Sequence, residues 1–265
     1  MVKTISSLQN PFIKQLIQLK EKSKLRKQTG LFIIEGKREL SLAIKGNYTI
    51  ETLYYYVDLF SASEAASLEI YGIDIIEITK TVYEKVAHRG TTEGIVAVAK
   101  AKNFDLNNLK FNSETPLILV AEAPEKPGNI GALLRTAEAA NVDAIIISNP
   151  LTDLYNPNII RSSVGGIFTV SIATGSSEDI ITYLKKQNIF IYAATLQDSV
   201  EYDSVNYKKA TALIVGAESV GLSSIWRDVA TAKIRIPMQG KIDSMNVSVA
   251  AGILVFEAKR QRKLS

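Results

Sequence analysis

Short apolar runs alternate with amphipathic stretches along the second half of the chain. The runs with the character of β-strands lie at 117–121, 144–148, 169–173, 189–194, 211–215 and 233–236. Between them, apolar residues recur every three or four positions, as in helices with one buried face, at 129–140, 157–165, 177–187, 222–231 and 246–262. This alternation predicts a mostly parallel sheet with helices on both faces, and hence an α/β fold.

The N-terminal part carries a different, shorter pattern. Helices are predicted at 11–26 and 37–45, and β-rich runs at 31–34, 52–57, 74–78 and 94–98. A polar, Asn-rich stretch follows and ends in Ser-Glu-Thr-Pro. We therefore predict two domains, a smaller α/β domain at 1–102 and a larger one at 116–265, joined by a linker at 103–115.

The composition narrows the chemistry. The chain is 46% hydrophobic with a mean hydropathy of +0.09, and it contains no Cys and a single His. This excludes a thiolate nucleophile, a disulfide and a thiolate zinc site, so no metal is expected. The first ten residues are polar and mixed, and no run of about 18 apolar residues could span a membrane. We expect a soluble, cytoplasmic protein that does not bind membranes.

Positive charge is concentrated at the two ends of the chain. Residues 1–45 hold ten Lys and Arg against three acids, a balance of +7, and residues 257–265 have a balance of +3. The region between them is acidic, at −6, and the whole chain is at +4. The alternative for the basic end is a solvated helix face, but the acidic remainder favours an arm that contacts RNA phosphates. The densest basic run comprises Lys20, Lys22, Lys24, Arg26 and Lys27.

Three separate segments place polar residues at the ends of predicted strands or the starts of predicted helices. Helix starts have unpaired N–H groups that can orient a ligand oxygen, and a glycine lets the backbone approach a flat ligand. Each segment also has a purely structural interpretation, as a surface ion pair or a helix cap. The residues in question are, in chain order, Asn129 and Arg135, then Gly216 and Glu218, then Ser244 and Asn246.

The order of these segments resembles the SpoU/TrmH branch of the SPOUT RNA methyltransferases. The matching motifs are Asn-x5-Arg, then Gly-x-Glu-x-x-Gly-Leu, then Ile-Pro-Met followed by Ser-x-Asn-Val-Ser-Val-Ala, and the resemblance covers 115–260. It implies a SPOUT domain with a deep trefoil knot, S-adenosyl-L-methionine as cofactor, an obligate homodimer, and methylation of a ribose 2′-hydroxyl in RNA. The segments 32–40 and 87–97 resemble an L30e-like substrate-binding domain, although the loop after His88 departs from the family pattern at Arg89.

The resemblance also assigns roles to residues. Arg135 would be the central catalytic residue, held in place with the ribose by Asn129, Glu218, Ser244 and Asn246. The cofactor would contact Thr195, Gly216, Ile236, Met238 and Met245, and RNA would contact Arg38 and Arg161 in addition to the basic run. A guanidinium keeps its proton at neutral pH, so we expect Arg135 to grip phosphate and stabilise the developing alkoxide. A transiently neutral arginine that acts as a base is the alternative.

Other functions are left open by the residues. The substrate implied is RNA, with 23S ribosomal RNA favoured by the N-terminal extension and transfer RNA as the alternative. A catalytically silent RNA-binding protein of the same fold would be expected to lack Arg135 or the Ser244/Asn246 pair, and all three are present. An unrelated nucleotide-dependent enzyme should carry a Gly-x-Gly-x-x-Gly loop or a nucleophile elbow, and neither motif occurs.

Overall fold

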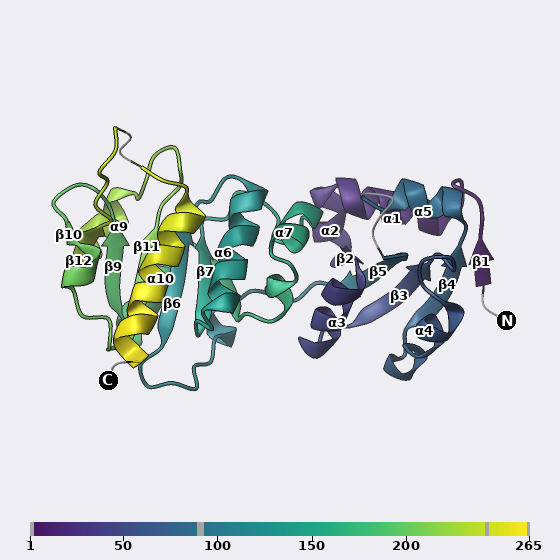
Figure 1. Ribbon diagram of the computed structural model, residues 1–265, viewed down its shortest axis with the longest axis horizontal. Helices are drawn as coiled ribbons and strands as arrows, with labels where there is room; N and C mark the ends of the chain where they lie inside the picture. The colour runs from purple at the N-terminus through teal and green to yellow at the C-terminus, as the bar shows by residue number, and fades with distance from the viewer. Residues whose placement is uncertain (1–2, 89–92, 242–243, 264–265) are drawn as a thin grey trace. The chain divides into compact units, whose positions relative to one another are not determined.

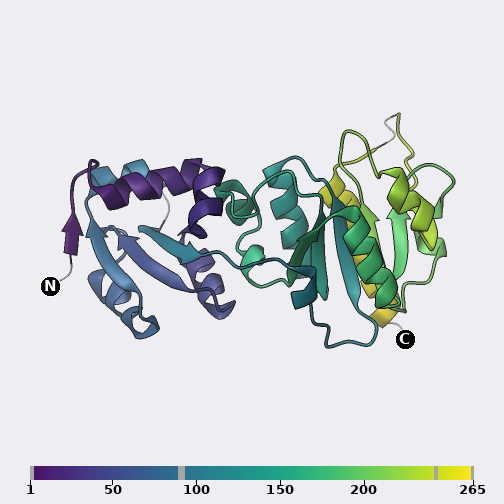
Figure 2. The ribbon, with the colours of Figure 1, turned by 180° about the vertical axis from the view of Figure 1, so that it is seen from behind.

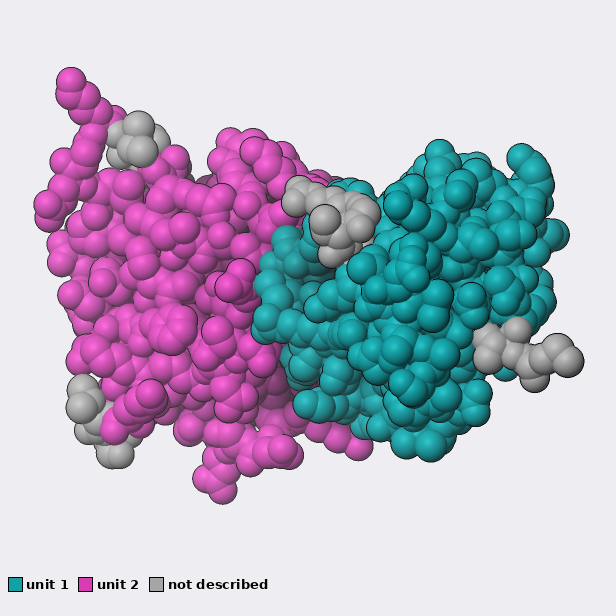
Figure 3. Space-filling view, turned by 45° about the vertical axis from the view of Figure 1, so that its right-hand side comes forward, with its two compact units in different colours: residues 1–103, 153–169 teal, residues 104–152, 170–265 magenta. Residues whose placement is uncertain are grey.

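The computed structural model describes residues 3–88, 93–241 and 244–263, so the predicted departure at Arg89 lies outside the described residues. The chain folds into two compact units (Figure 3). Unit 1 comprises residues 1–103 and 153–169, and unit 2 comprises residues 104–152 and 170–265. The segment 153–169 therefore folds with the N-terminal residues, although it lies between two strands of unit 2 in the sequence.

Unit 1 is built on a five-stranded sheet with the order β1-β4-β3-β5-β2. Its strands are β1 (Lys3–Ile5), β2 (Leu31–Glu35), β3 (Ile50–Tyr55), β4 (Asp74–Ile78) and β5 (Ile95–Lys100). The β5 strand runs antiparallel to both β2 and β3, whereas β4 is parallel to β1 and β3. The helices are α1 (Pro11–Glu21), α2 (Ser23–Thr29), α3 (Lys37–Lys45), α4 (Ala62–Ala66), α5 (Lys80–Val86) and α7 (Pro157–Ser162), with short 3-10 turns η1 (Glu69–Tyr71) and η3 (Gly166–Phe168).

The prediction of one helix at 11–26 was wrong. The chain leaves the helical conformation at Lys22, where φ is −112° and ψ is 106°, so that α1 and α2 are separate. Three apolar residues of α1, Ile13, Leu16 and Leu19, enter the core against α5. The break points α2 in a new direction, with the consequence that Arg26 is buried instead of continuing an exposed basic face.

The segment 153–169 packs into unit 1 through aromatic rings and a buried ion pair. The ring of Tyr155 stacks on Phe32 with centroids 4.2 Å apart, and Phe168 meets Tyr48 edge to face at 5.1 Å. Gly46 allows this approach, because a Cβ there would lie 2.1 Å from the Phe168 carbonyl oxygen. The segment also supplies α7 and η3, so the predicted helix at 157–165 ends early, at Ser162.

Unit 2 contains a seven-stranded sheet with the order β10-β12-β9-β11-β6-β7-β8, and every pairing in it is parallel. Its strands are β6 (Leu117–Glu122), β7 (Ala144–Ser148), β8 (Ile172–Gly175), β9 (Phe190–Ala194), β10 (Val200–Glu201), β11 (Thr211–Val215) and β12 (Ala232–Arg235). The predicted α/β class and parallel sheet are confirmed. The strand predicted at 169–173 is found at 172–175, as β8. Its predicted first residue, Thr169, instead folds with unit 1.

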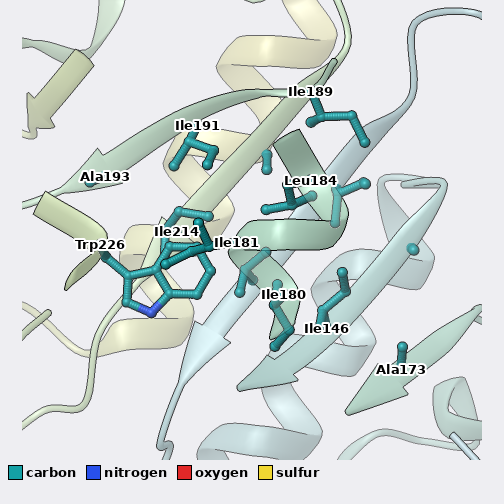
Figure 4. Close-up of a cluster of buried hydrophobic side chains, with 14 of the residues drawn as sticks. Ile146, Ala173, Ile180, Ile181, Leu184, Ile189, Ile191, Ala193, Ile214 and Trp226 are labelled. Carbon is teal, nitrogen blue, oxygen red and sulfur yellow. The ribbon is translucent and has the colours of Figure 1, made fainter. Parts of the chain in front are cut away.

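Helices cover both faces of this sheet. In Figure 1, α6 (Pro127–Ala139) and α10 (Val247–Lys263) lie side by side on one face, and Figure 2 shows α8 (Ser177–Lys186) and α9 (Ser224–Val229) on the other. Two short 3-10 turns, η2 (Leu106–Asn108) and η4 (Tyr202–Ser204), complete the unit. Alternate residues of the central strands pack beneath α8 and α9, with Trp226 completely buried among them (Figure 4). The sheet is thus a rigid platform whose loops carry the predicted site residues.

Candidate functional site

The predicted cofactor residues gather at one edge of the unit 2 sheet. Because the strands are parallel, their carboxyl ends meet at a common edge, the usual location of ligand sites in open α/β sheets. Thr195, Gly216 and Ile236 directly follow β9, β11 and β12, and β9 lies between the other two strands. Gly216 is needed there, since a Cβ would lie 2.2 Å from the backbone carbon of Gly221.

A cavity of about 430 Å³ lies beside these strand ends. Its lining includes Ile236 and Met238, two of the predicted cofactor residues, together with Leu196, which follows Thr195. The other three predicted cofactor residues, Thr195, Gly216 and Met245, are not among its lining residues. The full lining is Leu196, Glu201, Arg235, Ile236, Pro237, Met238, Gly240 and Lys241. Three of these residues are charged, and the others offer an apolar surface on which a flat adenine ring could lie.

One chain of hydrogen bonds joins residues from all three sequence segments. The amide of Asn129, at the start of α6, donates to Glu218 and accepts from Asn246 Nδ2 at 3.1 Å. Asn246 in turn caps α10, because its Oδ1 accepts from the N–H and the hydroxyl of Ser248 at 3.0 Å and 2.6 Å. These residues are up to 117 positions apart in the sequence. The structure thus brings together Asn129, Glu218 and Asn246.

Arg135 and Ser244 are not part of this chain of hydrogen bonds. Arg135 lies further along α6 than Asn129, its side chain is exposed, and it forms no hydrogen bond or ion pair with any described residue. Ser244 is also exposed and makes no hydrogen bond within the described part of the chain. An exposed guanidinium without a partner remains available to bind an anionic ligand.

Sequence reasoning missed a buried polar cluster beneath the site. Glu122, the last residue of β6, is 6% exposed and accepts hydrogen bonds from Ser223 and Ser177. The indole N–H of Trp226 donates to the same Ser177 hydroxyl at 3.0 Å. The signal was present in the sequence, because Glu122 is an acid that directly follows the apolar run 117–121. Burying a carboxylate requires partners, so such a residue indicates a polar network.

In the basic run of unit 1, some side chains are exposed to solvent and others are bound to groups of the protein itself. Lys22, Lys24 and Lys27 are exposed and face solvent. The Nζ of Lys20 instead donates to the carbonyl oxygens of Val86 and Ala87, at 3.1 Å and 2.8 Å. Only the three exposed lysines are fully available to a phosphate backbone.

Arg26 differs from the sequence expectation. Its side chain is 4% exposed, pairs with Asp153 at 2.5 Å, and donates to the carbonyl of Leu19 at 2.6 Å. Because α2 turns away at Lys22, this guanidinium points into unit 1. We therefore correct the expected RNA-contacting set: Arg26 is a structural residue.

Arg38 and Arg161 line one cavity of about 330 Å³ in unit 1. Arg161 Nη2 is held by Asn158 at 2.8 Å. Glu35 lies in the same cavity wall, where its Oε2 accepts from the His88 N–H at 2.8 Å. Its Oε1 is shielded from solvent and has no hydrogen-bond partner among the residues that the structure describes. Burial raises the pKa of Glu35, opposed by the His88 N–H and by the charges of Lys20 and Arg161.

Two features are absent from the described residues. These residues contain no group of three or more His, Cys, Asp and Glu residues placed to hold a metal ion. None of the described helices combines the length and apolar character needed to cross a membrane.

Unit 2 thus combines a parallel sheet that has a cavity at its carboxyl edge with an exposed arginine and a chain of hydrogen-bonded polar side chains on the segments that follow its strands. These features are typical of cofactor-binding α/β domains. Residues 116–256 match the SpoU rRNA Methylase family, and residues 10–97 match the MRM3-like substrate binding domain. The chain belongs to the SpoU rRNA methylase family.

Individual relatives agree with this assignment. The 23S rRNA (guanosine(2553)-2′-O)-methyltransferase RlmP of Bacillus subtilis is 26% identical, over 97% of this chain and 100% of its own length. The 23S rRNA (guanosine-2′-O-)-methyltransferase RlmB of Vibrio parahaemolyticus is 33% identical, over 74% of this chain and 81% of its own. The crystal structure of an AdoMet-bound rRNA methyltransferase from Sinorhizobium meliloti superposes with a TM-score of 0.90 at 30% identity, covering 98% of both chains.

Proposed function

We propose that the protein methylates the ribose 2′-hydroxyl of a nucleotide in 23S ribosomal RNA, with S-adenosyl-L-methionine as methyl donor. The observation that carries this proposal is the hydrogen-bonded chain of Asn129, Glu218 and Asn246, which assembles the three family motifs at one end of α6 and α10. The names of the relatives support the substrate class, and an rRNA substrate supports a cytoplasmic location.

The residues at the sheet edge fit the cofactor. Ile236 and Met238 offer an apolar wall. We assign Thr195 and Gly216 to the same adenosine because they directly follow the neighbouring strands β9 and β11. We assign Met245 to the same contact surface because it lies beside Asn246 at the start of α10. When bound, S-adenosyl-L-methionine supplies a methyl carbon on a positively charged sulfur.

The role of this chain's residues is to place and polarise the ribose. We assign the 2′-oxygen to Arg135, whose guanidinium stabilises the negative charge that develops as the hydroxyl loses its proton. That proton passes to water or to a phosphate oxygen of the substrate. Asn129, Glu218 and Asn246 hold the helix ends that frame the site, and Ser244 supplies an additional hydroxyl at the same end of α10. The alternative, Arg135 as the base itself, is separated from this mechanism by the Arg135→Lys variant described below.

Unit 1 provides RNA affinity in this proposal. The exposed lysines at 22, 24 and 27, with Lys20 beside them, form a basic surface for phosphates, and Arg38 and Arg161 form a second contact region around the 330 Å³ cavity. Both groups of cations lie in unit 1, whereas the cofactor cavity lies in unit 2. RNA binding by unit 1 therefore does not depend on the cofactor cavity.

We also propose a homodimer and a knotted C-terminal region, as in the family. Support for the dimer comes from α10, where Val249 and Phe256 are 54% and 53% exposed and lie seven residues apart on one face. Pairing of two such faces would cover apolar surface and bring Arg135, on the adjacent α6, near a second chain.

Two measurements test the proposal. Mapping of 2′-O-methyl groups in ribosomal and transfer RNA from a deletion strain should reveal one missing site in 23S rRNA, and a missing site in transfer RNA would support the alternative substrate. Calorimetry should detect S-adenosyl-L-methionine binding that is unchanged by a chelator. Absence of any missing methyl group, together with retained RNA binding, would favour the silent RNA-binding protein.

A further inference from the structure

Three contacts join the segment 122–129, from the end of β6 to the start of α6, to the loop after β11. Glu122 accepts from the N–H of Ser223 at 2.8 Å and from its hydroxyl at 2.6 Å. Glu125 accepts from the Ser219 hydroxyl at 2.6 Å, and Asn129 donates to Glu218. We call these the three inter-loop contacts. They hold the loop at 216–223 from its middle to its end.

The three inter-loop contacts differ in how readily water can replace the hydrogen bond. Glu125, Ser219 and Glu218 are exposed, and Asn129 is half-buried, so water can compete for these hydrogen bonds. Glu122 is buried, and its carboxylate is the only acceptor among the described residues for both the N–H and the hydroxyl of Ser223. A hydrogen bond to a charged group is strongest where it is shielded from water, so we expect Glu122–Ser223 to be the strongest of the three inter-loop contacts.

Glu122 is itself held by groups that leave it little freedom. Ser177, 2% exposed, accepts from Trp226 Nε1 and from Asn149 Nδ2, both at 3.0 Å. A hydroxyl has two acceptor positions and one proton, so these two donors leave Ser177 only its proton to give. Ser148 Oγ lies 2.8 Å away, but the carboxylate of Glu122, at 3.1 Å, is the stronger acceptor. Both oxygens of Glu122 thus accept, Oε1 from the Ser177 and Ser223 hydroxyls and Oε2 from the Ser223 N–H. An amide at position 122 would turn its NH2 toward one of these donors, so the cluster requires a carboxylate.

We propose that Glu122 is a positioning residue for methyl transfer, which acts by fixing the loop 216–223 that carries Gly216 and Glu218. The proposal rests on the proposed function, because its consequence is expressed in cofactor binding and catalysis. Glu122 does not touch the reacting atoms in this scheme. Its effect passes through Ser223 at the end of the loop, while the close approach of Gly216 to Gly221 closes the start of the loop.

The chain contains a built-in reporter for this cluster. Trp226 is the only tryptophan, it is completely buried, and its indole N–H donates to the Ser177 hydroxyl that in turn donates to Glu122. In a ¹⁵N-labelled sample of the full chain, its indole resonance is a single peak. We expect this peak to shift when S-adenosyl-L-methionine binds, because the loop and the cluster share Ser223.

The test compares Glu122→Gln with Glu125→Gln, the same chemical change three residues later at an exposed contact. Glu122→Gln should shift the Trp226 peak, weaken its response to S-adenosyl-L-methionine, and lower kcat at least about tenfold, the scale of one charge-assisted hydrogen bond. The KM for RNA should not change, because unit 1 supplies that affinity. Glu125→Gln should lower kcat less than about threefold, because water replaces an exposed hydrogen bond.

Ser223→Ala protects the test against a Glu122 variant that does not fold. It removes only the hydroxyl contact at an exposed position and should lower kcat by an intermediate factor, with an unchanged melting temperature. Equal activity of wild type and Ser223→Ala, or equal effects of Glu122→Gln and Glu125→Gln, would overturn the proposal. Wild-type protein that neither binds S-adenosyl-L-methionine nor methylates rRNA would instead contradict the proposed function, whatever the variants do.

Discussion

Two buried strands, one in each unit, end in a glutamate, and the two carboxylates meet opposite conditions. In unit 2, Glu122 ends β6 and both of its oxygens accept hydrogen bonds. In unit 1, Glu35 ends β2, and within the described part of the chain only its Oε2 has a hydrogen-bond partner, the His88 N–H. The local sequences, Leu-Ile-Leu-Val-Ala-Glu and Leu-Phe-Ile-Ile-Glu, are alike. Neighbours from distant parts of the chain therefore decide whether a buried charge is compensated.

The same contrast extends to the two units as wholes. In unit 2, polar side chains near the strand ends are bonded to one another, while Arg135 remains exposed and unpaired among the described residues. In unit 1, some cations face solvent, whereas Lys20 is bound to backbone carbonyl oxygens and Arg26 is buried against an acid. We infer that unit 2 carries the chemistry, and that unit 1 carries RNA affinity and depends on its own buried pair for stability.

The largest expected effect is on catalysis, in unit 2. Arg135→Ala should abolish methyl transfer and leave the melting temperature and the Kd for S-adenosyl-L-methionine unchanged, because the side chain is exposed and leaves no cavity. Arg135→Lys should lose about 10²-fold in kcat if the planar guanidinium stabilises the alkoxide. Methylation of rRNA with labelled cofactor measures both variants.

The same pair of variants can contradict the assignment. Activity of Arg135→Lys that rises steeply with pH would indicate proton abstraction by this residue. Near-wild-type turnover by Arg135→Ala would remove Arg135 from the mechanism.

The next effect is on stability, in unit 1. Asp153→Ala leaves the Arg26 guanidinium buried without its carboxylate partner and should lower the free energy of unfolding by about 3–5 kcal/mol. Glu84→Ala, which breaks the exposed Lys80–Glu84 pair, should cost about 0.5 kcal/mol or less. Urea denaturation measures both, and similar values for the two variants would mean that Arg26–Asp153 is not the structural pair described here.

A smaller effect is expected on RNA affinity. Changing Lys22, Lys24 and Lys27 to Gln should reduce the slope of log K against log salt by about 2–3, since each phosphate contact contributes about 0.7–0.9. The matched control changes three exposed lysines of unit 2, Lys110, Lys185 and Lys186, and should leave the slope unchanged. Filter binding to an rRNA fragment over a range of salt concentrations gives both slopes, and equal slopes would show that the α1–α2 lysines are only a solvated face.

The smallest effect concerns Glu35, whose charge is only partly compensated. Burial raises the pKa of Glu35 above its ordinary value of 4.5 in the folded state, so the folded protein retains this proton at pH values where the unfolded chain has lost it. The contribution of Glu35 to the free energy of unfolding is therefore greatest below about pH 4.5, and it falls as the pH rises through the folded-state pKa of Glu35. Glu35→Gln should flatten this part of the stability curve and be neutral or stabilising at pH 7. A curve identical to that of the wild type would mean that the charge is already compensated.

Much of the fold could be predicted because helices and strands depend on the pattern of apolar residues over short stretches of the chain. The run 117–121 is apolar at every position and became β6, and the helical spacing from Val247 onward became α10. The order of Asn129, Glu218 and Asn246 was also visible, since each residue stands at the end of a recognisable element. Burial of a strand or a helix face is a property of consecutive residues, so periodicity reveals it.

Only the tertiary structure decided which polar side chains have partners within the protein. The charge of Arg26 indicates an RNA contact when read with its lysine neighbours, but its partner Asp153 is 127 residues away. Glu122 gave no sign of binding Ser223, 101 residues later. The segment 153–169 has helical spacing within the larger domain's sequence, yet its aromatic rings pack with Phe32 and Tyr48 in unit 1. The sequence by itself determined most of the elements of unit 2 and the order of the motifs. The compensation of each buried charge depended on partners far along the chain, because hydrogen bonds and ion pairs act over a few ångströms in space and leave no period in the sequence.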